Sequence, residues 1–334
     1  MSSPPGRSSA TPIEQDARQW LRTQSKALHF RLDGELELVQ QRPWSTVLRV
    51  PTDDGLLYLK SCGPRSRYEA GLTSLLSRLH PDCSPETLAF DAQHGWLLMR
   101  DAGNRLRDGI QLENAKSHWA RILERYAALQ IDLAGRTDQL LEIGLPDRRL
   151  LRLPELYVSL LENPVMLGVG DPDGLTGDQL ERLRAFRPRL VQICSQLEAA
   201  GIPQSVNHGD FHDGNIFLQD GRYLFTDWGD ASLAHPFFSL RTVFVSIENT
   251  LGIEENSPLQ FELRDIYLNA WSALVPQASA REAFDLASRI WAFSSALGWF
   301  QALRNASDES RAPFAAAIPG LLDELLTANS REDD

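Results

Sequence analysis

The sequence is poor in cysteine. Its 334 residues include three, at Cys62, Cys83 and Cys194, which lie far apart and form no Cys-x-x-Cys pair. A disulfide framework needs paired cysteines and a structural zinc site needs closely spaced ones, so neither is expected. We expect reduced, mostly buried thiols in a cytoplasmic protein.

Basic residues are also scarce, with 33 Lys and Arg against 45 Asp and Glu, for a net charge of −12. Nucleic acids and anionic membranes are bound through clustered Lys and Arg, so neither is expected as a partner. A cationic substrate is compatible with this charge. The chain has no apolar run of 18 residues, so no membrane-spanning segment is expected.

The start of the chain has no apolar stretch of the kind found in signal peptides. It is rich in Ser, Pro and Gly, and we expect residues 1–12 to be a disordered tail. The whole chain is 43% hydrophobic, which is enough for an ordinary core.

Residues 13–100 show short alternating segments with turn signals between them. Tight turns are expected at 53–55 and 93–95, and helices at 13–27 and 68–79. The strands expected between them are 30–39, 44–50, 56–62, 87–90 and 96–99. The pattern predicts a small, mostly antiparallel sheet with one helix packed on it.

Residues 101–330 are mostly of helical pattern. A capping box at Thr176 begins one helix, and Pro188 is expected to break or kink it. The other helices expected are 112–134, 149–162, 237–250, 257–274, 279–305 and 312–328. The fold class predicted is therefore α+β.

One stretch of the second region carries a set of hard oxygen ligands. Asp210 and Asn215 lie in a polar loop after an apolar strand, and Asp227 follows a second short strand, 17 positions after Asp210. Such ligands suit Mg²⁺, and the remaining carboxylate can orient a hydroxyl, as phosphoryl transfer requires. Turn residues capping strand ends would explain each residue singly but not the set.

A metal-dependent hydrolase is another interpretation of the same loops. It would use His208, Asp210, His212 and Asp227 as ligands and bases. This hypothesis expects tight Zn²⁺ or Mn²⁺ binding without a nucleotide.

The run His208-Gly209-Asp210-x-His212-x-Gly214-Asn215, followed by Asp227-Trp228-Gly229, resembles the catalytic and metal loops of the aminoglycoside phosphotransferase and choline kinase-like family. The resemblance covers residues 28–310. It implies a two-lobed, protein-kinase-like fold. Residues 13–100 would form a nucleotide-binding lobe with an antiparallel sheet, and 101–330 a helical lobe with both loops.

The resemblance also implies roles for the loop residues. Asp210 would be the catalytic aspartate, and Asn215 and Asp227 would bind Mg²⁺. His208 would be structural, with its ring bonded to backbone near the metal loop.

In the first lobe, Lys60 would contact the α- and β-phosphates of ATP, held by Glu69 nine residues on. A solvated surface pair is the alternative, since Arg65 and Arg67 offer Glu69 rival partners.

The sequence departs from the kinase pattern at two places. It has no glycine-rich loop: residues 41–46 stand there, with backbone N–H groups and the Ser45 and Thr46 hydroxyls to bind phosphate oxygens. Ser239 also stands where an aspartate is common, so the hydrogen bonding around the loop histidine is expected to differ.

Adenine is expected against a hinge near Met99, Arg100, Asp101 and Ala102, through backbone groups. The acceptor is expected between Asp210 and the C-terminal helices, near Asp230 and Trp299. Further candidates for its pocket, for which core packing or surface exposure is the competing interpretation, are Trp271, Trp291, Phe293, Phe300, Glu248 and Asp265.

Together these features predict an ATP- and Mg²⁺-dependent small-molecule kinase. Its acceptor would carry a hydroxyl and an amino group, as an amino sugar, aminoglycoside or amino alcohol does. A protein substrate is disfavoured because no Ala-Pro-Glu segment follows Asp227. The alternative is a catalytically silent relative that binds a nucleotide or metabolite as a regulator.

Overall fold

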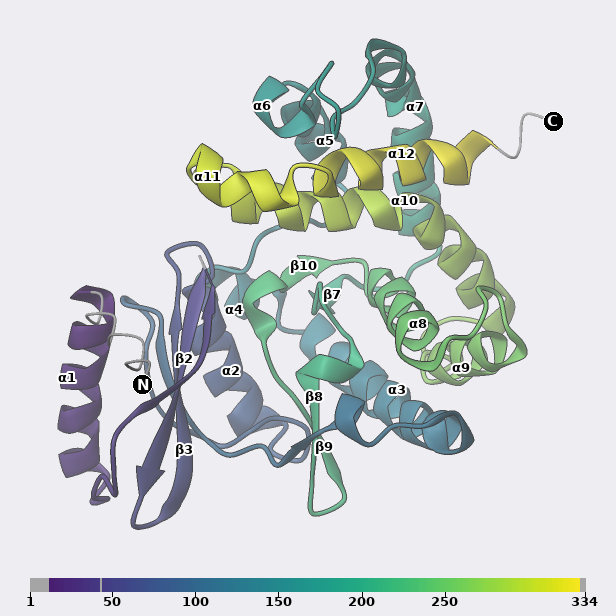
Figure 1. Cartoon of the computed structure of the whole chain (residues 1–334). Helices are drawn as coiled ribbons and strands as arrows, with labels where there is room; N and C mark the ends of the chain where they lie inside the picture. Colours follow the sequence, from purple (N-terminus) through teal and green to yellow (C-terminus); the bar gives the residue numbers. More distant parts are fainter. Residues whose placement is uncertain (1–11, 43, 331–334) are drawn as a thin grey trace. The chain divides into compact units, whose positions relative to one another are not determined.

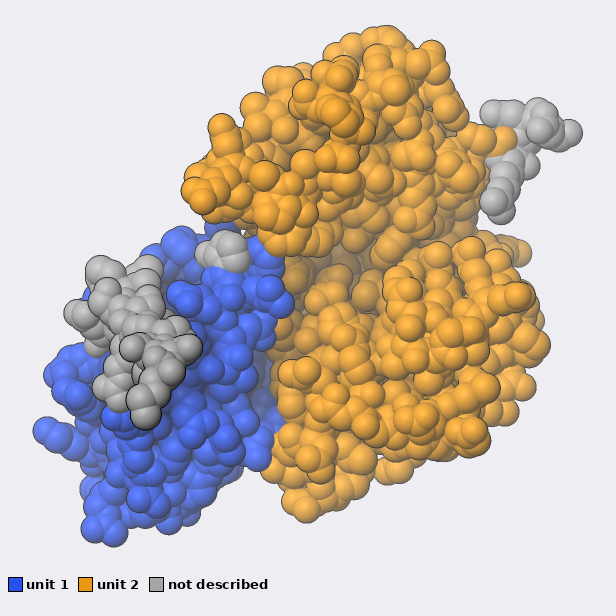
Figure 2. All heavy atoms as spheres, in the orientation of Figure 1, with its two compact units in different colours: residues 1–102 blue, residues 103–334 orange. Residues whose placement is uncertain are grey.

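The computed structural model describes residues 12–42 and 44–330, with the side chains of 12–15 excepted. The disordered tail expected at residues 1–12 therefore lies almost wholly outside the described residues. The chain forms two compact units, Met1–Ala102 and Gly103–Asp334 (Figure 2).

The first unit is built on a five-stranded antiparallel sheet in the order β1-β2-β3-β5-β4 (Figure 1). The tight turns expected at 53–55 and 93–95 are confirmed, since Thr52 pairs with Gly55 and Asp91 with Trp96. The elements are α1 (Pro12–Ala27), β1 (Glu37–Arg42), β2 (Ser45–Thr52), β3 (Gly55–Cys62), α2 (Tyr68–Leu79), β4 (Thr87–Asp91) and β5 (Trp96–Arg100).

The sheet has a helix on each side rather than the single packed helix expected (Figure 1). Ala17 and Leu21 of α1 share a buried core with Leu57 and Leu59 of β3. Because side chains alternate along a strand, Lys60 and Cys62 point to the opposite face, where Glu69 of α2 meets them.

The strand expected at 30–39 is confirmed only in its last residues, because β1 begins at Glu37. Phe30 is buried in the core and Leu32 forms an isolated bridge with Thr52, so this stretch is anchored without becoming a strand. Regular pairing begins at Glu37, after the turn at Gly34, which has φ +126°. Leu36, just before β1, packs against the core, but all of β1 is exposed, Leu38 included, so the alternation at Leu36 and Leu38 did not mark one buried face.

The second unit is mainly helical and contains two small sheets, β6-β8-β9 and β10-β7. Its strands are β6 (Asn104–Arg105), β7 (Ser205–Asn207), β8 (Ile216–Gln219), β9 (Arg222–Phe225) and β10 (Ser232–Ala234). Its α-helices are α3 (Leu112–Ala134), α4 (Thr137–Ile143), α5 (Leu153–Leu161), α6 (Pro164–Leu167), α7 (Gly177–Ala199), α8 (Phe238–Leu251), α9 (Pro258–Asn269), α10 (Gln277–Leu303), α11 (Asp308–Arg311) and α12 (Ala317–Ser330). Short 3₁₀ turns are η1 (Leu106–Asp108), η2 (Asp213–Asn215), η3 (Trp228–Asp230) and η4 (Ala312–Phe314).

Helix α3 forms the base of the loop region. Its buried face carries Trp119, Tyr126 and Gln130, and it packs against β7 and α9. Helix α10 packs against α12, α7 and α5 in the other part of the unit. The predicted loops are therefore connected at both ends to strands or helices that are buried.

Three helix predictions need correction. Of the break or kink expected at Pro188, the break is wrong: α7 continues through it, because buried Leu183 and Leu190 pack on both sides and offset one lost backbone hydrogen bond. The helix expected at 149–162 is confined to 153–161, since a hydrogen-bonded turn from Arg149 to Arg152 precedes Leu153. α9 ends at Asn269, so Trp271 lies beyond it.

Within residues 12–42 and 44–330, none of the helices combines the length and apolarity that a membrane crossing needs.

Candidate active site

The loop that follows β7 is held by a close backbone approach at Gly209. This residue has φ +81°, and a Cβ there would lie 2.3 Å from the carbonyl oxygen of Asp230. Only glycine fits both conditions. The loop with Asp210 therefore lies directly against the turn that follows Asp227.

The Asp210 carboxylate receives two side-chain hydrogen bonds on the same oxygen. Asn215 Nδ2 donates to Oδ2 at 3.2 Å and also to the Asp210 carbonyl at 3.0 Å. His212 Nε2 lies 3.2 Å from Oδ2. The side chain is 45% exposed, so its other oxygen, Oδ1, can accept a hydroxyl group.

The tautomer of His212 follows from its other ring nitrogen. Nδ1 accepts a hydrogen bond from the Gly214 N–H at 2.9 Å, so the proton is on Nε2, facing Asp210. Burial raises the pKa of Asp210, but the hydrogen bonds from His212 and Asn215 outweigh it and lower that pKa below its ordinary value. Asp210 is therefore a carboxylate at neutral pH.

His208 crosslinks the two loops. Its Nε2 donates to the Thr226 carbonyl at 2.9 Å, and its Nδ1 accepts from the Asp210 N–H at 3.3 Å. The residue is fully buried, and burial lowers the pKa of His208 to about 4, although the charges of Asp210 and Asp227 act to raise it. With both nitrogens used, the ring cannot be a metal ligand, which removes one residue from the hydrolase hypothesis.

Asn215 and Asp227 offer oxygen donors of the kind Mg²⁺ prefers. Asn215 uses its amide nitrogen on Asp210, so its side-chain oxygen is the atom that could bind a cation. Asp227 is exposed and has φ +62°, a conformation that Asp tolerates better than most residues. The donor set fits a hard divalent cation and lacks the soft ligands that zinc favours.

In the first unit, Lys60 and Glu69 form a buried ion pair. Lys60 Nζ lies 2.6 Å from Glu69 Oε1, and the side chains are 7% and 2% exposed. The Cys62 thiol donates to the other carboxylate oxygen at 3.2 Å. The alternative of a solvated surface pair is wrong for these two residues.

Ser45 and Thr46 lie in a tight hairpin rather than an open loop. Arg42 pairs with Ser45 and Gln41 with Thr46, and both also pair with β3. This strand pairing uses backbone groups that were expected to bind phosphate oxygens. Mainly the Ser45 and Thr46 hydroxyls remain for that role. Pro43, part of the same prediction, lies outside the described residues.

The expected adenine hinge is partly used by the sheet. Met99 sits on a central strand, paired with Tyr58 and Thr87. The Arg100 N–H donates to Glu86 and the Asp101 N–H to Leu56. Of the predicted hinge residues, Ala102 is the one that follows these ladder contacts, at the end of the first unit.

The residues predicted to line the acceptor site divide into two groups. Asp230 is exposed in η3, and Trp299 of α10 is half-buried against Phe314, with ring centroids 5.2 Å apart. Trp271 and Phe293 are fully buried, so they belong to the core and cannot line a site. Of the remaining candidates, Trp291 and Phe300 are half-buried, while Glu248 and Asp265 are paired with arginines.

Several site residues were not found from the sequence. His212 appeared there only as a possible metal ligand, whereas the structure makes it a donor to Asp210. Arg107, which pairs with buried Asp213 beside it, gave no signal because its partner is 106 positions away. Cys62 was treated as an ordinary buried thiol.

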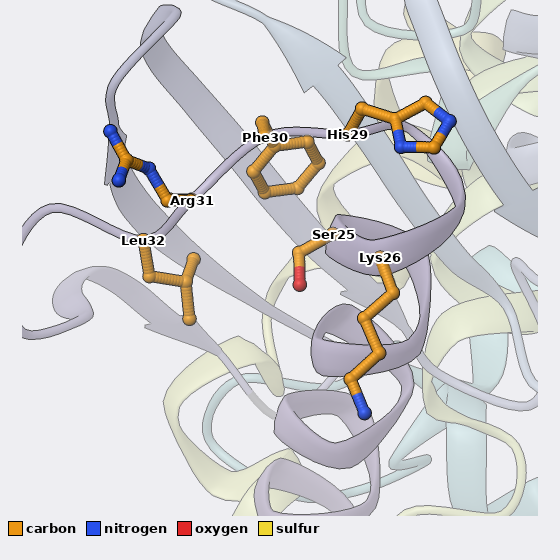
Figure 3. A pocket seen from close by; sticks show the side chains of 6 residues that line it. All are labelled: Ser25, Lys26, His29, Phe30, Arg31 and Leu32. Carbon is orange, nitrogen blue, oxygen red and sulfur yellow. The ribbon is translucent and has the colours of Figure 1, made fainter.

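A pocket of about 580 Å³ lies in the first unit, at the C-terminal end of α1 (Figure 3). It is lined by Ser25, Lys26, His29, Phe30, Arg31 and Leu32. None of the predicted site residues is among them, and the carbonyl end of α1 opposes anion binding there. The pocket plays no part in the site described above.

The chain matches the model of the phosphotransferase enzyme family over residues 1–280, and it belongs to that family. The curated glucosamine kinase of Streptacidiphilus jiangxiensis is 45% identical over 53 residues. That match spans 16% of this chain and only 12% of the length of the relative.

Solved structures share the fold along most of the chain. A choline/ethanolamine kinase family protein from Mesorhizobium loti is 18% identical, with a TM-score of 0.54, covering 95% of this chain and 98% of that one. A macrolide 2'-phosphotransferase from Brachybacterium faecium is 16% identical, with a TM-score of 0.58, covering 90% and 98%. The family resemblance and the α+β fold, with an antiparallel-sheet N-terminal lobe and a helical C-terminal region, are confirmed.

Proposed function

We propose that this phosphotransferase moves the γ-phosphoryl group of ATP to a hydroxyl of a small, amino-bearing metabolite. The geometry around Asp210 supports this most directly: two donors hold Oδ2 of an ionised carboxylate whose side chain is 45% exposed. That arrangement orients a hydroxyl without needing a strong base. The roles proposed for the other residues depend on this role of Asp210.

In this reaction the acceptor oxygen forms a bond to the γ-phosphorus while the bond to the β–γ bridging oxygen breaks, which releases ADP. The hydroxyl proton passes to Asp210 Oδ1. Because a pKa below the ordinary aspartate value makes the carboxylate a weak base, the proton moves late, as the phosphoryl group transfers. Catalysis then comes mainly from positioning.

Asn215 and Asp227 would hold Mg²⁺, which when bound neutralises charge on the phosphates. Their oxygen donors support this assignment. Lys60 would contact the α- and β-phosphates, with Glu69 and Cys62 fixing its position. Ser45 and Thr46 would offer hydroxyls to phosphate oxygens, and the backbone near Met99, Arg100 and Ala102 would face adenine.

An amino-bearing acceptor is supported by the acidity of the chain and by its relatives. The net charge is −12, and Asp230 is an exposed acid in the turn packed on Gly209. Figure 2 shows the second unit hollowed between the part with α10–α12 and the part with α8 and α9. Trp299 of α10 is the aromatic residue we assign to the acceptor, and the glucosamine kinase match fits an amino sugar.

The nucleotide assignment also has support among the relatives. A Streptomyces rimosus aminoglycoside phosphotransferase of the same fold, 19% identical with a TM-score of 0.50, was solved with ADP and streptomycin. Dependence on ATP and three buried free thiols suit the cytoplasm, where we place the protein.

The test incubates the full chain with Mg-ATP and each of a panel of amino sugars, aminoglycosides and amino alcohols, and follows ADP. We expect acceptor-dependent ADP release for one of these classes, with the phosphorylated product seen by ³¹P NMR. Nucleotide binding without turnover on any acceptor would instead favour the silent regulator. Tight Zn²⁺ or Mn²⁺ in the purified protein, with hydrolysis and no nucleotide requirement, would favour the hydrolase.

A further inference from the structure

A buried set of hydroxyl and amide groups lies beneath the Asp210 loop and takes no direct part in the proposed chemistry. The backbone N–H of His208 donates to the Tyr126 hydroxyl at 3.0 Å. The Tyr126 hydroxyl lies 2.8 Å from Ser239 Oγ, which in turn lies 2.6 Å from Asn207 Oδ1. All four residues are at most 5% exposed.

The direction of each bond in this chain is fixed. Asn207 Oδ1 can only accept, so Ser239 donates its hydroxyl hydrogen to it. Ser239 must then accept from Tyr126, and Tyr126 accepts from His208. Burial raises the pKa of Tyr126, so its hydroxyl keeps the hydrogen that this order requires.

The chain closes on itself through the peptide bond between Asn207 and His208. It starts at the N–H of His208, passes through α3 and α8, and ends on the side chain of Asn207. Two neighbouring residues at the end of β7 are therefore held from two separate helices. Asn207 Oδ1 is also 3.4 Å from the Gly209 N–H, which extends the restraint into the loop.

His208 passes this restraint to both functional loops. Its ring bonds the Asp210 N–H on one side and the Thr226 carbonyl, next to Asp227, on the other. Any shift of the His208 backbone moves the ring and hence both aspartates.

We infer that Tyr126 and Ser239 are positioning residues, whose hydroxyls act in series through His208 to set the place of Asp210. This inference rests on the proposed phosphoryl transfer. It also explains how the chain does without an aspartate at 239: a neutral hydroxyl can both accept from Tyr126 and donate to Asn207, which a carboxylate cannot.

The network has further support at its base. Gln130 Nε2 donates to the Val206 carbonyl at 2.8 Å, and Tyr267 donates to Gln130 Oε1 at 2.6 Å. The Tyr126 ring stacks on Phe211, with centroids 4.0 Å apart. The Tyr126 ring position is thus fixed by packing, so removing its hydroxyl should leave the ring in place.

The test compares Tyr126→Phe, Ser239→Ala and the double variant with a matched control. Tyr157→Phe is that control, because the buried Tyr157 hydroxyl bonds the Leu183 carbonyl at 2.8 Å, within helices α5 and α7. Hydrogen exchange of peptides covering residues 205–211 is measured by mass spectrometry. Melting temperature, kcat and the KM for ATP are measured alongside.

We expect Tyr126→Phe and Ser239→Ala to speed exchange in 205–211, and Tyr157→Phe to leave that segment unchanged at a similar loss of melting temperature. We expect kcat to fall between about 10-fold and 100-fold with an unchanged KM for ATP, since misplacement affects the reacting groups. The double variant should lose no more than Tyr126→Phe alone, because both hydroxyls belong to one chain. Ser239→Thr, which keeps the hydroxyl, should restore most of the rate.

Unchanged exchange in 205–211, or additive losses of kcat, would overturn the inference. If the wild-type chain forms no ADP with any acceptor, the proposed function fails, and the exchange measurement alone then decides whether the hydroxyl chain holds the loop. If Tyr126→Phe does not fold, Ser239→Ala carries the same comparison.

Discussion

Two neutral histidines at this site act as hydrogen-bond donors rather than as bases. His212 donates to Asp210 and His208 to Thr226, and in both rings the second nitrogen accepts from a backbone N–H. Neither ring therefore adds a positive charge beside the Asp210 carboxylate. At the scale of single residues, the hydrogen bond accepted by one nitrogen of each histidine ring decides that the other nitrogen carries the proton and donates.

In the first unit, the hydrogen bond from Cys62 to Glu69 leads to a testable prediction. Its thiol holds Glu69 Oε2 while Lys60 holds Oε1, so Cys62→Ala leaves a buried carboxylate oxygen with one donor fewer. We expect the KM for ATP to rise a few-fold and stability to fall by roughly 1 kcal/mol. Steady-state kinetics and urea unfolding measure both.

Two further variants separate the hydrogen bond from packing. Cys62→Ser keeps a donor and should retain the wild-type KM. Cys194→Ala removes another buried thiol, on α7, and should leave the KM for ATP unchanged. A raised KM in the Cys194 variant, or an unchanged one in Cys62→Ala, would contradict the role given to Cys62.

At the scale of elements, the loop after β7 depends on how closely it approaches η3. Gly209→Ala would place a Cβ 2.3 Å from the Asp230 carbonyl oxygen, in addition to straining a residue with φ +81°. We expect the variant to lose more than about 2 kcal/mol of stability and most of its activity.

Gly221→Ala is the control for backbone strain alone. Gly221 has φ +76°, and nothing lies within 4 Å of the Cβ it would gain. We expect a loss of about 1 kcal/mol and normal kinetics. Chemical unfolding and kcat are measured for both variants, to show whether the close backbone approach, rather than φ, requires glycine at 209. Equal losses of stability and activity in Gly209→Ala and Gly221→Ala would refute that requirement.

Much of this element layout could be predicted from the sequence. Regular periodicity located α1, α2 and α3, and the Asp-Asp-Gly and Gln-His-Gly turns located two hairpins. The first part of the strand expected at 30–39 could not be placed, because buried Phe30 packs into the core and exposed Leu32 makes only an isolated bridge with Thr52, and both contacts are long-range. The break expected at Pro188 was wrong for a similar reason. Packing of α7 against other helices outweighs the local loss of one backbone hydrogen bond.

The candidate site was predictable only where a short motif carried it. Asp210, Asn215 and Asp227 lie within 18 residues of sequence, and the structure brings Asp210 and Asn215 into contact. Tyr126 and Arg107 reach the loop from far along the chain, and no local pattern marks such contacts; Ser239 was expected near the loop histidine only through the family resemblance. The prediction that aromatic residues line the acceptor site was wrong for Trp271 and Phe293. Helical spacing does not distinguish a residue of the core from one that lines a cavity.

At the scale of the whole molecule, the chain combines a sheet unit with a paired lysine and a helical unit with both functional loops. The stability of the second unit should depend on pH through His235. Its ring is fully buried, Nδ1 accepts from the Phe237 N–H at 3.3 Å, and Nε2 has no hydrogen-bond partner among the described residues. Burial lowers the pKa of His235 to about 3.

The sign of the effect follows from that lowered pKa. Between the ordinary histidine pKa of about 6.5 and about 3, the unfolded chain binds a proton at this site that the folded chain does not, so stability falls as pH decreases and is flat above pH 6.5. His235→Asn keeps an acceptor for Phe237 but cannot titrate. From pH 7.5 to 5 we expect it to lose about 2 kcal/mol less than the wild type, by urea unfolding. Equal losses would show that His235 is not buried neutral.

In the proposed reaction, Asp210 orients the acceptor hydroxyl for phosphoryl transfer from ATP. The direct measurement is the acceptor-dependent rate of ADP formation by Asp210→Asn, together with its affinity for Mg-ATP by calorimetry; Asp220→Asn, in the exposed β8–β9 turn, is the control. We expect Asp210→Asn to lose at least about 100-fold in kcat with little change in Mg-ATP affinity, and the control to match the wild type. Wild-type turnover in Asp210→Asn would contradict the account.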